Sequence, residues 1–369
     1  MSKKITNNST NKSVIKPSVN TIDVYGKPNI KLNVVEQKKL NDNWLYIEIE
    51  GPNVDNTIVN AIRRTILLYI PIYGFHRSNI FIEANRFKNM YNFDLIYNIF
   101  ETLPIFDVPN HYDLENPETF LTNEVMRNIF GKFIQDKYNI DDTPTQELMD
   151  ADKKLFKIEL TLNLKNNTGD YRYVSSHDCV LKIDGKISNS YTKREPIYLL
   201  VLKPSEEISL RAEANLGIAK IFAAYEATTN ATHEEINANK WLLKYKTLEQ
   251  LDKYTIFNKA CVILYKKLEN LQKYIIETYD TERDPKETIT INLHGEEHTI
   301  GTLLERVLQL NENVEKAGYK MPHPFIDEIV ISYKLYDDSK IGPIKIFTDC
   351  TKYLIKVFKT IADISPNSD

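Results

Sequence analysis

One stretch of the sequence has residue types and spacing that could bind a catalytic metal, His294-Gly295-Glu296-Glu297-His298. It fits the pattern H-x-x-E-H, in which both histidines bind zinc and Glu297 activates a metal-bound water. That chemistry requires the histidines to lie one turn apart on a formed helix. The alternation of apolar and polar residues from Ile289 to Leu293 instead predicts a strand that runs into the motif, and Gly295 disfavours a helix. We expect a turn here, followed by a helix that begins near His298, and a zinc-dependent hydrolase is the alternative function.

Other patterns that commonly carry catalysis are missing from the sequence. It has no glycine-rich phosphate loop, no clustered aspartate triplet and no nucleophile with a paired base. The cysteines Cys179, Cys261 and Cys350 are isolated, which indicates a reducing compartment and argues against disulfides or a cysteine zinc site. We therefore expect no catalytic residue, no bound metal and no cofactor.

Length and composition indicate an ordinary soluble protein. The 369 residues are enough for about two or three domains, and 42% of them are hydrophobic and 27% charged. No apolar run reaches the roughly 18 residues that a bilayer span needs, and the N-terminus lacks the apolar core of a signal peptide. We expect an intracellular protein with no membrane contact. A net charge of −4 argues against a general grip on nucleic acid, so DNA and RNA contacts should be indirect.

The clearest structural signal is a strand followed by a helix. Leu45 to Glu50 alternates as a half-buried strand, Asp55 is a suitable N-cap, and apolar residues then recur at helical spacing until the chain reaches Pro71. Asn29 to Val35 alternates as a second strand.

This unit recurs near the C-terminus. A shift of 242 positions places Ile47 on Ile289, Asp55 on Glu297, and Arg64 on Arg306. The strand and the helix start both align, so we expect two related helix-on-sheet units.

The remaining pattern predicts further elements. A short strand is expected at Ile80 to Ala84, strands at Leu155 to Leu164 and Cys179 to Ile183, and a strand at Glu207 to Ala214 that returns the chain to the first sheet. Helices are expected at Phe120 to Ile134, Leu248 to Ile276 and Phe347 to Ile364, with a strand at Asp327 to Tyr336.

Two sets of motifs connect these units to known families. The "NAIRR" run from Asn60 to Arg64, with Val174 to Asp178 and Gly217-Ile218-Ala219-Lys220, resembles the alpha subunit family of cellular RNA polymerases, which includes the archaeal D subunit and the eukaryotic third subunit. The run from His298 to Thr302, with Ala317-Gly318-Tyr319 and Pro322-His323-Pro324 in a following loop, resembles the archaeal L subunit and the eleventh subunit of RNA polymerase II.

The resemblance implies an α+β fold in which the two units form an internal pseudo-dimer that replaces a separate partner chain. We divide the chain into a disordered tail (1–20), an alpha-like dimerisation domain (21–106 plus 205–280), an inserted α+β domain (107–204), a connector (281–287) and a second, smaller dimerisation domain (288–369). The tail could alternatively be a weak nucleic-acid arm.

The resemblance also implies a function, that of a non-catalytic assembly platform for the two large catalytic subunits and the small subunits of a DNA-directed RNA polymerase. Such fusions are a feature of large cytoplasmic DNA viruses, which implies a location in the virion and the host cytoplasm. A scaffold outside any polymerase is the remaining alternative. The implied interface residues are Asn60, Ile62, Arg63, Arg64, Ile66, His298, Thr299, Gly301, Leu304, Arg306, Gly318, Tyr319, Pro322, His323 and Pro324. Solvated arginines, helix caps and a proline-stiffened loop are the simpler readings of these positions.

Overall fold

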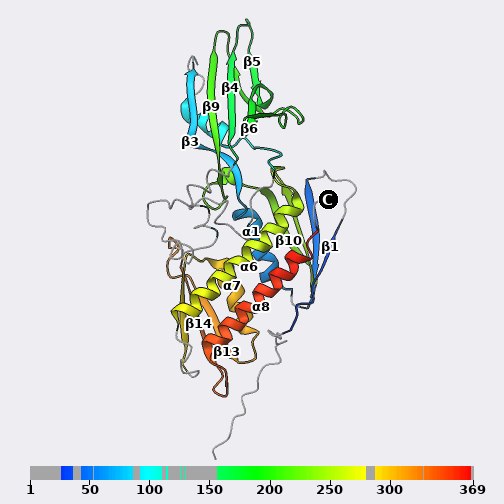
Figure 1. Ribbon diagram of the computed structural model, residues 1–369, viewed down its shortest axis with the longest axis vertical. Helices are drawn as coiled ribbons and strands as arrows, with labels where there is room; N and C mark the ends of the chain where they lie inside the picture. Colours follow the sequence, from blue (N-terminus) through cyan, green and yellow to red (C-terminus); the bar gives the residue numbers. More distant parts are fainter. Residues whose placement is uncertain are drawn as a thin grey trace, which may run out of the picture.

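The computed structural model describes residues 26–35, 43–52, 54–85, 92–109, 156–279, 287–326 and 328–366, together with Leu114, Val125 and Ile129. The fold is α+β, as expected. In Figure 1 one end of the molecule is mostly made of strands, and the other end combines sheets with long helices. None of the helices within these ranges is long and apolar enough to cross a bilayer.

The first helix-on-sheet unit contains an antiparallel sheet of order β1-β2-β11-β10. Its strands are β1 (Lys31–Val34), β2 (Trp44–Glu50), β11 (Lys240–Thr247) and β10 (Thr228–Asn237). Leu45, Ile47 and Ile49 of β2 are buried, and α1 (Asn56–Leu68) packs against β10 and β11. Asp55 accepts hydrogen bonds from the backbone N–H groups of Thr57 and Ile58, which confirms the predicted N-cap.

The second unit has the sheet order β12-β14-β13. It consists of β12 (Ile289–His294), α7 (His298–Gln309), β13 (Val314–Lys320) and β14 (Glu328–Leu335). The prediction that Ala317 to Tyr319 lie in a loop is wrong, because these residues pair with β14 in β13. The strand was not predicted because it contains Gly318 and several charged residues, and only one of its faces is covered.

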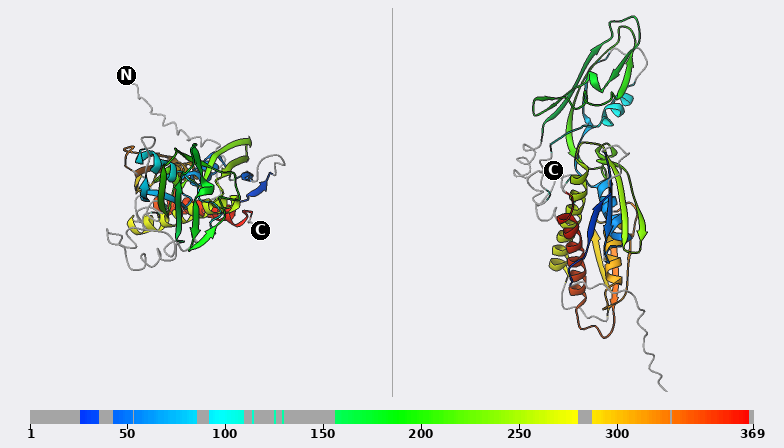
Figure 2. Two further views of the ribbon diagram at one scale, coloured as in Figure 1. Left: turned by 90° about the horizontal axis from the view of Figure 1, so that it is seen from above. Right: turned by 90° about the vertical axis from the view of Figure 1, so that its right-hand side faces the viewer.

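Two long helices join the units. The helix α6 (Lys253–Thr278) packs along α8 (Pro343–Asp363), while α1 also contacts α6 and α7 contacts α8. Figure 2 shows α6 and α8 side by side on one side of the strands. Both helices were predicted, but α6 begins five residues later than expected, at the side-chain cap of Asp252.

The strand-rich end holds a five-stranded sheet of order β3-β9-β4-β6-β7, and a separate pair, β5-β8. Its strands are β3 (Ile72–Asn85), β4 (Ile158–Lys165), β5 (Arg172–Ser175), β6 (Val180–Ile183), β7 (Lys186–Ser188), β8 (Tyr198–Leu202) and β9 (Glu207–Gly217). Helix α2 (Phe93–Glu101) packs on β3.

Two strand predictions need correction here. The strand at Glu207 to Ala214 was expected to join the first sheet, but β9 lies between β3 and β4. Alternation shows that one face of a strand is buried and does not identify its neighbours. The strand β3 begins at Ile72 rather than near Ile80.

Three predictions fall wholly or largely outside the described residues. These are the tail at residues 1–20, the connector at 281–287 apart from its last residue, and the helix at Phe120 to Ile134. Within that helix, Val125 and Ile129 are described, and both are helical and buried.

Candidate functional site

The two helix starts are linked by reciprocal contacts between α1 and α7. Arg64 of α1 donates from Nε to the Thr299 hydroxyl at 2.8 Å, and Arg306 of α7 donates from Nε to the Asp55 carboxylate at 3.0 Å. Arg64 and Arg306 are equivalent in the internal repeat, as are Thr57 and Thr299. The arginine of each helix therefore contacts the start of the other helix. Such reciprocal contacts are typical of a two-fold interface.

Asp55 has two roles at this interface. Its Oδ1 accepts from the first-turn N–H groups of α1 at 3.0 and 3.2 Å, while its Oδ2 faces Arg306. One carboxylate thus caps its own helix and binds the other one. Its counterpart Glu297 occupies the N-cap of α7 without a side-chain cap bond, because its carboxylate pairs with Lys220 at 2.8 Å.

A second, buried ion pair lies beside these contacts. Lys267 of α6 is 3.1 Å from Glu296, and both side chains are 7% exposed. The ammonium groups of Lys220 and Lys267 also lie 5.7 and 5.0 Å from the ring centre of Tyr69, the residue that ends α1. Two lysines that precede the second unit in the chain therefore bind the two glutamates in front of α7.

Burial and the partner charge act on the pKa values of this pair in opposite directions. Loss of hydration alone would lower the pKa of Lys267, but Glu296 and Tyr69 act against it and the pKa is raised. Lys267 therefore stays charged, and a charge so deeply buried requires Glu296 as its partner.

The motif residues of the second unit form one cluster. The Tyr319 hydroxyl lies 3.1 Å from Nδ1 of His298 and 3.0 Å from the Thr302 hydroxyl. Its ring covers Gly301 so closely that a Cβ at this position would lie 2.6 Å from the ring. The glycine is required because the tyrosine ring packs directly on the helix backbone.

The other predicted interface residues divide into two groups. Ile62, Ile66 and Leu304 are fully buried in the shared core. Arg63 instead bonds Asn60 within its own helix and reaches the Ala231 carbonyl of β10 at 3.5 Å. This places Arg63 against its own sheet.

Gly318 lies in β13, whereas Pro322, His323 and Pro324 lie in an exposed turn. Phe325 extends that turn and is 90% exposed. These positions contribute nothing to the contacts between α1 and α7.

The geometry around the H-x-x-E-H stretch differs from that of a zinc protease. His294 ends β12 and its Nδ1 lies 3.7 Å from Glu328, while His298 opens α7 and contacts Tyr319. Gly295 between them has φ +78°, so the expected turn is confirmed. In the part of the chain that the structure describes, no three His, Cys, Asp or Glu residues are grouped to bind a metal.

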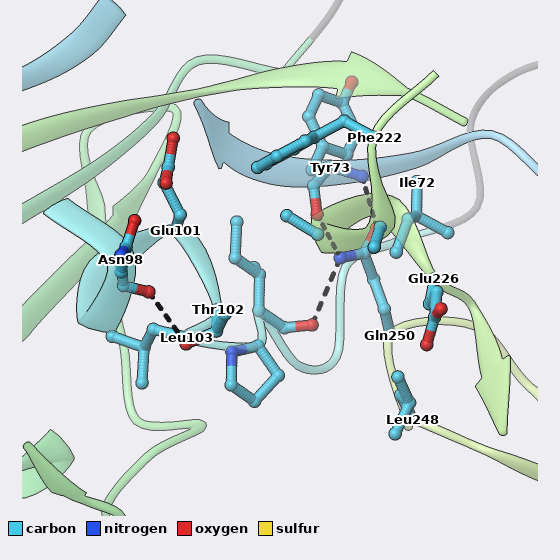
Figure 3. Close-up of a pocket in the computed structure, with 14 residues that line it drawn as sticks. Ile72, Tyr73, Asn98, Glu101, Thr102, Leu103, Phe222, Glu226, Leu248 and Gln250 are labelled. Atoms are coloured by element: carbon cyan, nitrogen blue, oxygen red, sulfur yellow. Dashed lines mark hydrogen bonds between the residues drawn. The ribbon is translucent and has the colours of Figure 1, made fainter. Parts of the chain in front are cut away.

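A cavity lies where the first sheet meets the strand-rich end. It has a volume of about 490 Å³ and is lined mainly by apolar residues, among them Ile72, Leu103 and Phe222. Figure 3 shows Gln250 beside it, accepting from the Tyr73 N–H at 2.6 Å and donating to the carbonyls of Tyr73 and Ile105 at 2.8 and 3.2 Å. This buried amide joins β3 to the segment that follows α2.

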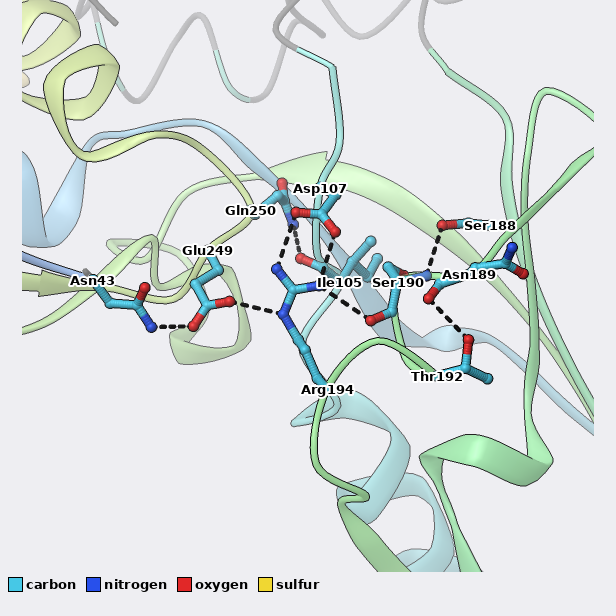
Figure 4. Close-up of polar contacts among 10 residues, drawn as sticks. All are labelled: Asn43, Ile105, Asp107, Ser188, Asn189, Ser190, Thr192, Arg194, Glu249 and Gln250. Carbon is cyan, nitrogen blue, oxygen red and sulfur yellow. Dashed lines mark hydrogen bonds and ion pairs between the residues drawn. The ribbon is translucent and has the colours of Figure 1, made fainter. Parts of the chain in front are cut away.

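Arg194 contributes further contacts at the same junction (Figure 4). It donates to both carboxylate oxygens of Asp107, at 2.8 and 3.0 Å, and to Glu249 at 2.7 Å. Asp107 and Glu249 have φ values of 54° and 65°, a conformation that is unfavourable for residues with a side chain. The guanidinium group of Arg194 therefore stabilises the strained backbone at both Asp107 and Glu249.

Seven residues of these contacts were not predicted from the sequence: Lys220, Lys267, Glu296, Glu249, Gln250, Arg194 and Asp107. A signal existed for Lys220, which ends the "GIAK" motif, and for the acidic pair before α7. Nothing in the local pattern marks the other five, because their partners are distant in sequence.

The chain is similar in sequence to subunits of DNA-directed RNA polymerases. Residues 288–363 match the RNA polymerase Rpb3/Rpb11 dimerisation domain. A protein of Acanthamoeba polyphaga mimivirus, provisionally named as a DNA-directed RNA polymerase subunit, is 64% identical over 355 residues, which cover 96% of this chain and 99% of the relative.

Shorter similarities concern small polymerase subunits. The RNA polymerases I and III subunit RPAC2 of Caenorhabditis briggsae is 31% identical over 87 residues, 24% of this chain and 58% of the relative. The subunit Rpo11 of Sulfurisphaera tokodaii is 38% identical over 61 residues, 16% of this chain and 63% of the relative. The chain therefore belongs to the family of DNA-directed RNA polymerase subunits, as a fusion of two alpha-like subunits in one polypeptide.

Proposed function

We propose that the two halves of this chain form an internal pseudo-dimer that acts as the assembly platform for the large subunits of a DNA-directed RNA polymerase. The observation that carries the proposal is the reciprocal pair of contacts, Arg64 with Thr299 and Arg306 with Asp55. A protein that needed only one helix-on-sheet unit would have no use for a matched pair of helix starts that bind each other.

The proposed role needs no chemistry from this chain. We infer that it supplies no catalytic residue and that its surfaces bind the two large catalytic subunits and small polymerase subunits. With a viral relative, the virion and the host cytoplasm are the proposed sites of action.

We also propose a division of the chain. The helix-bearing core comprises residues 21–106 with 205–280 and residues 288–369, and residues 107–204 form an insert. Since β4 pairs with β9, and β9 with β3, the insert shares a sheet with the strands that flank it. A sheet continuous across both boundaries supports a rigidly attached insert.

Covalent fusion favours pairing of the halves. Joining two binding units by a short linker raises the effective concentration of each for the other to roughly the millimolar range. Assembly then loses one bimolecular step.

The test is an affinity purification of the tagged chain from its native source, with partners identified by mass spectrometry. The proposal expects two co-purified polymerase subunits larger than this chain and template-dependent RNA synthesis in the eluate. A tagged Arg64→Glu/Arg306→Glu variant should recover less of both, while a matched Lys352→Glu/Lys356→Glu variant on exposed α8 positions should not. Recovery of the chain alone, with stoichiometric zinc, would instead favour the hydrolase.

A further inference from the structure

The two related sheets differ in the charge of the faces that point away from their helices. In the second sheet, Ile289, Ile291 and Leu293 of β12 are buried, so Thr290 and Asn292 point outward. Strand register aligns Thr290 with Ser332 and Gly318, and Asn292 with Val330 and Lys320. Lys316 and Lys334 form the next row of this outward face.

The outward face contains an open hollow of about 390 Å³. Its floor is formed by small or uncharged residues, Gly318, Ser332 and Val330. Its rim carries three lysines, Lys316, Lys320 and Lys334. The hollow lies beside β13, which pairs with β14 alone among the described strands and is an edge of the sheet.

Two of the three lysines have no ionic partner among the described residues. Lys334 binds Glu315 at 2.9 Å, but neither Lys316 nor Lys320 has a described carboxylate within ion-pair distance. Glu305 of α7 accepts from Gln309 and lies near Gly318, so it adds one negative charge beside the three lysines. The rim is therefore basic, although the chain as a whole carries a net charge of −4.

The corresponding face of the first sheet shows that this is not a general property of the unit. There Lys240 pairs with Glu48 at 2.9 Å, and Lys244 lies 3.9 Å from Glu234. One sheet face neutralises these lysines internally, and the other leaves two of them available.

We propose that the basic hollow of the second sheet binds an extended acidic segment of a partner polymerase subunit. This rests on the proposed function and names one of its contact surfaces. The Ala317 carbonyl of β13 already accepts from Gln309 of α7 at 3.1 Å, so a partner strand would pair with the remaining backbone groups of this edge. The lysines beside the edge would select carboxylates on alternate residues of the bound segment. The uncharged floor accommodates the segment between the charged rows.

The structure favours a protein segment over nucleic acid. Three lysines without an arginine offer few phosphate contacts, and each contact contributes only about one unit to the salt dependence of binding. Of the two tyrosines that line the hollow, Tyr333 is buried and the Tyr319 ring packs against Gly301, so neither offers a free face to a base.

The test uses the intact polymerase purified through this chain. A carbodiimide couples amines directly to carboxylates in contact, and the products are mapped by mass spectrometry. We expect Lys316 or Lys320 joined to an Asp- or Glu-rich peptide of another subunit. Recovery of that subunit should fall about tenfold in a Lys316→Glu/Lys320→Glu variant at moderate salt, and persist in Lys316→Arg/Lys320→Arg and in the α8 control Lys352→Glu/Lys356→Glu.

The outcomes separate this inference from the function on which it rests. A complete polymerase recovered with the charge-reversed variant, without cross-links at either lysine, overturns the acidic-segment site and leaves the platform intact. Photo-cross-linking to labelled RNA or DNA that is lost in the same variant also overturns it, in favour of nucleic acid. If the wild-type chain recovers no polymerase subunit, both proposals fail.

Discussion

The Arg64 guanidinium donates to the Thr299 hydroxyl across 235 positions of sequence, at a distance of 2.8 Å. Arg306, which is equivalent to Arg64 in the internal repeat, donates in the opposite direction, to the Asp55 carboxylate. The two contacts are similar in geometry and differ in chemistry, because one acceptor is a hydroxyl and the other a carboxylate. This difference allows the two sides of the interface to be tested separately.

Asp55→Ala should destabilise the protein more than Arg306→Ala. The first change removes a helix cap, which costs about 1–2 kcal/mol, together with the ion pair. The second removes only a pair that is partly solvent-exposed, at 45% and 31%, and such pairs contribute about 0.2–1 kcal/mol. Urea denaturation of both single variants and the double variant measures the coupling.

Asp252→Ala is the matched control for that cycle, because Asp252 caps α6 through its side chain in the same way. It should cost about as much as the cap portion of Asp55→Ala. A coupling energy of zero between Asp55 and Arg306 would contradict the two roles assigned to Asp55.

Gly301→Ala should destabilise the second unit by about 1–3 kcal/mol, because the new methyl group would meet the Tyr319 ring at 2.6 Å. Thermal unfolding followed by circular dichroism gives the change. Gly169→Ala serves as the control, since a Cβ there meets nothing within 4 Å. In a Tyr319→Ala background the same glycine substitution should cost less; an unchanged cost would show that the ring is not the obstacle.

Lys267→Met should cost about 3–5 kcal/mol, because it leaves the Glu296 carboxylate buried without its partner. Replacing both residues, Lys267→Met with Glu296→Leu, should restore most of the loss. Chemical denaturation of the three proteins provides the comparison. Lys359→Met, which breaks an exposed pair with Glu269, should change stability far less.

The contribution of Asp107 should depend on pH. The hydrogen bonds from Arg194 hold the pKa of this carboxyl below its usual value. Its stabilising effect is therefore complete above the unfolded pKa of about 3.9 and is lost as the pH falls through the lower folded pKa. The difference in unfolding free energy between the wild type and Asp107→Asn should shrink between about pH 5 and pH 2.

Other carboxylates titrate in that range, so only the difference between the two proteins is informative. Asp184→Asn is a suitable comparison, because the Asp184 side chain accepts from the backbone of Lys157 and has no arginine partner within the described part of the chain. A pH-independent gap for Asp107→Asn would rule out the Arg194 contact as its source.

The sequence was sufficient where a pattern was local and long. The strand β2, the capped helix α1 and the helix α8 each combine strict periodicity with a clear start, and each was predicted within a few residues. The internal repeat also predicted that Arg306 would correspond to Arg64.

Prediction failed where the information was not local. The hairpin of β10 and β11 was missed, although Trp241, Leu243 and Tyr245 alternate clearly in it. The partner of β9 could not be read from its own residues. The contacts of Arg194 depend on left-handed backbone at Asp107 and Glu249, which neither residue type favours strongly enough to signal.

Among the described residues, the ion pair of Lys220 with Glu297 has no counterpart at the start of α1, where Asp55 faces Arg306 instead. The α1–α7 interface is consequently asymmetric, unlike that of a true two-fold dimer, because exchanging its two halves does not reproduce the same contacts. A neighbour that binds across this interface meets distinct left and right ends, so it can be seated in a single orientation.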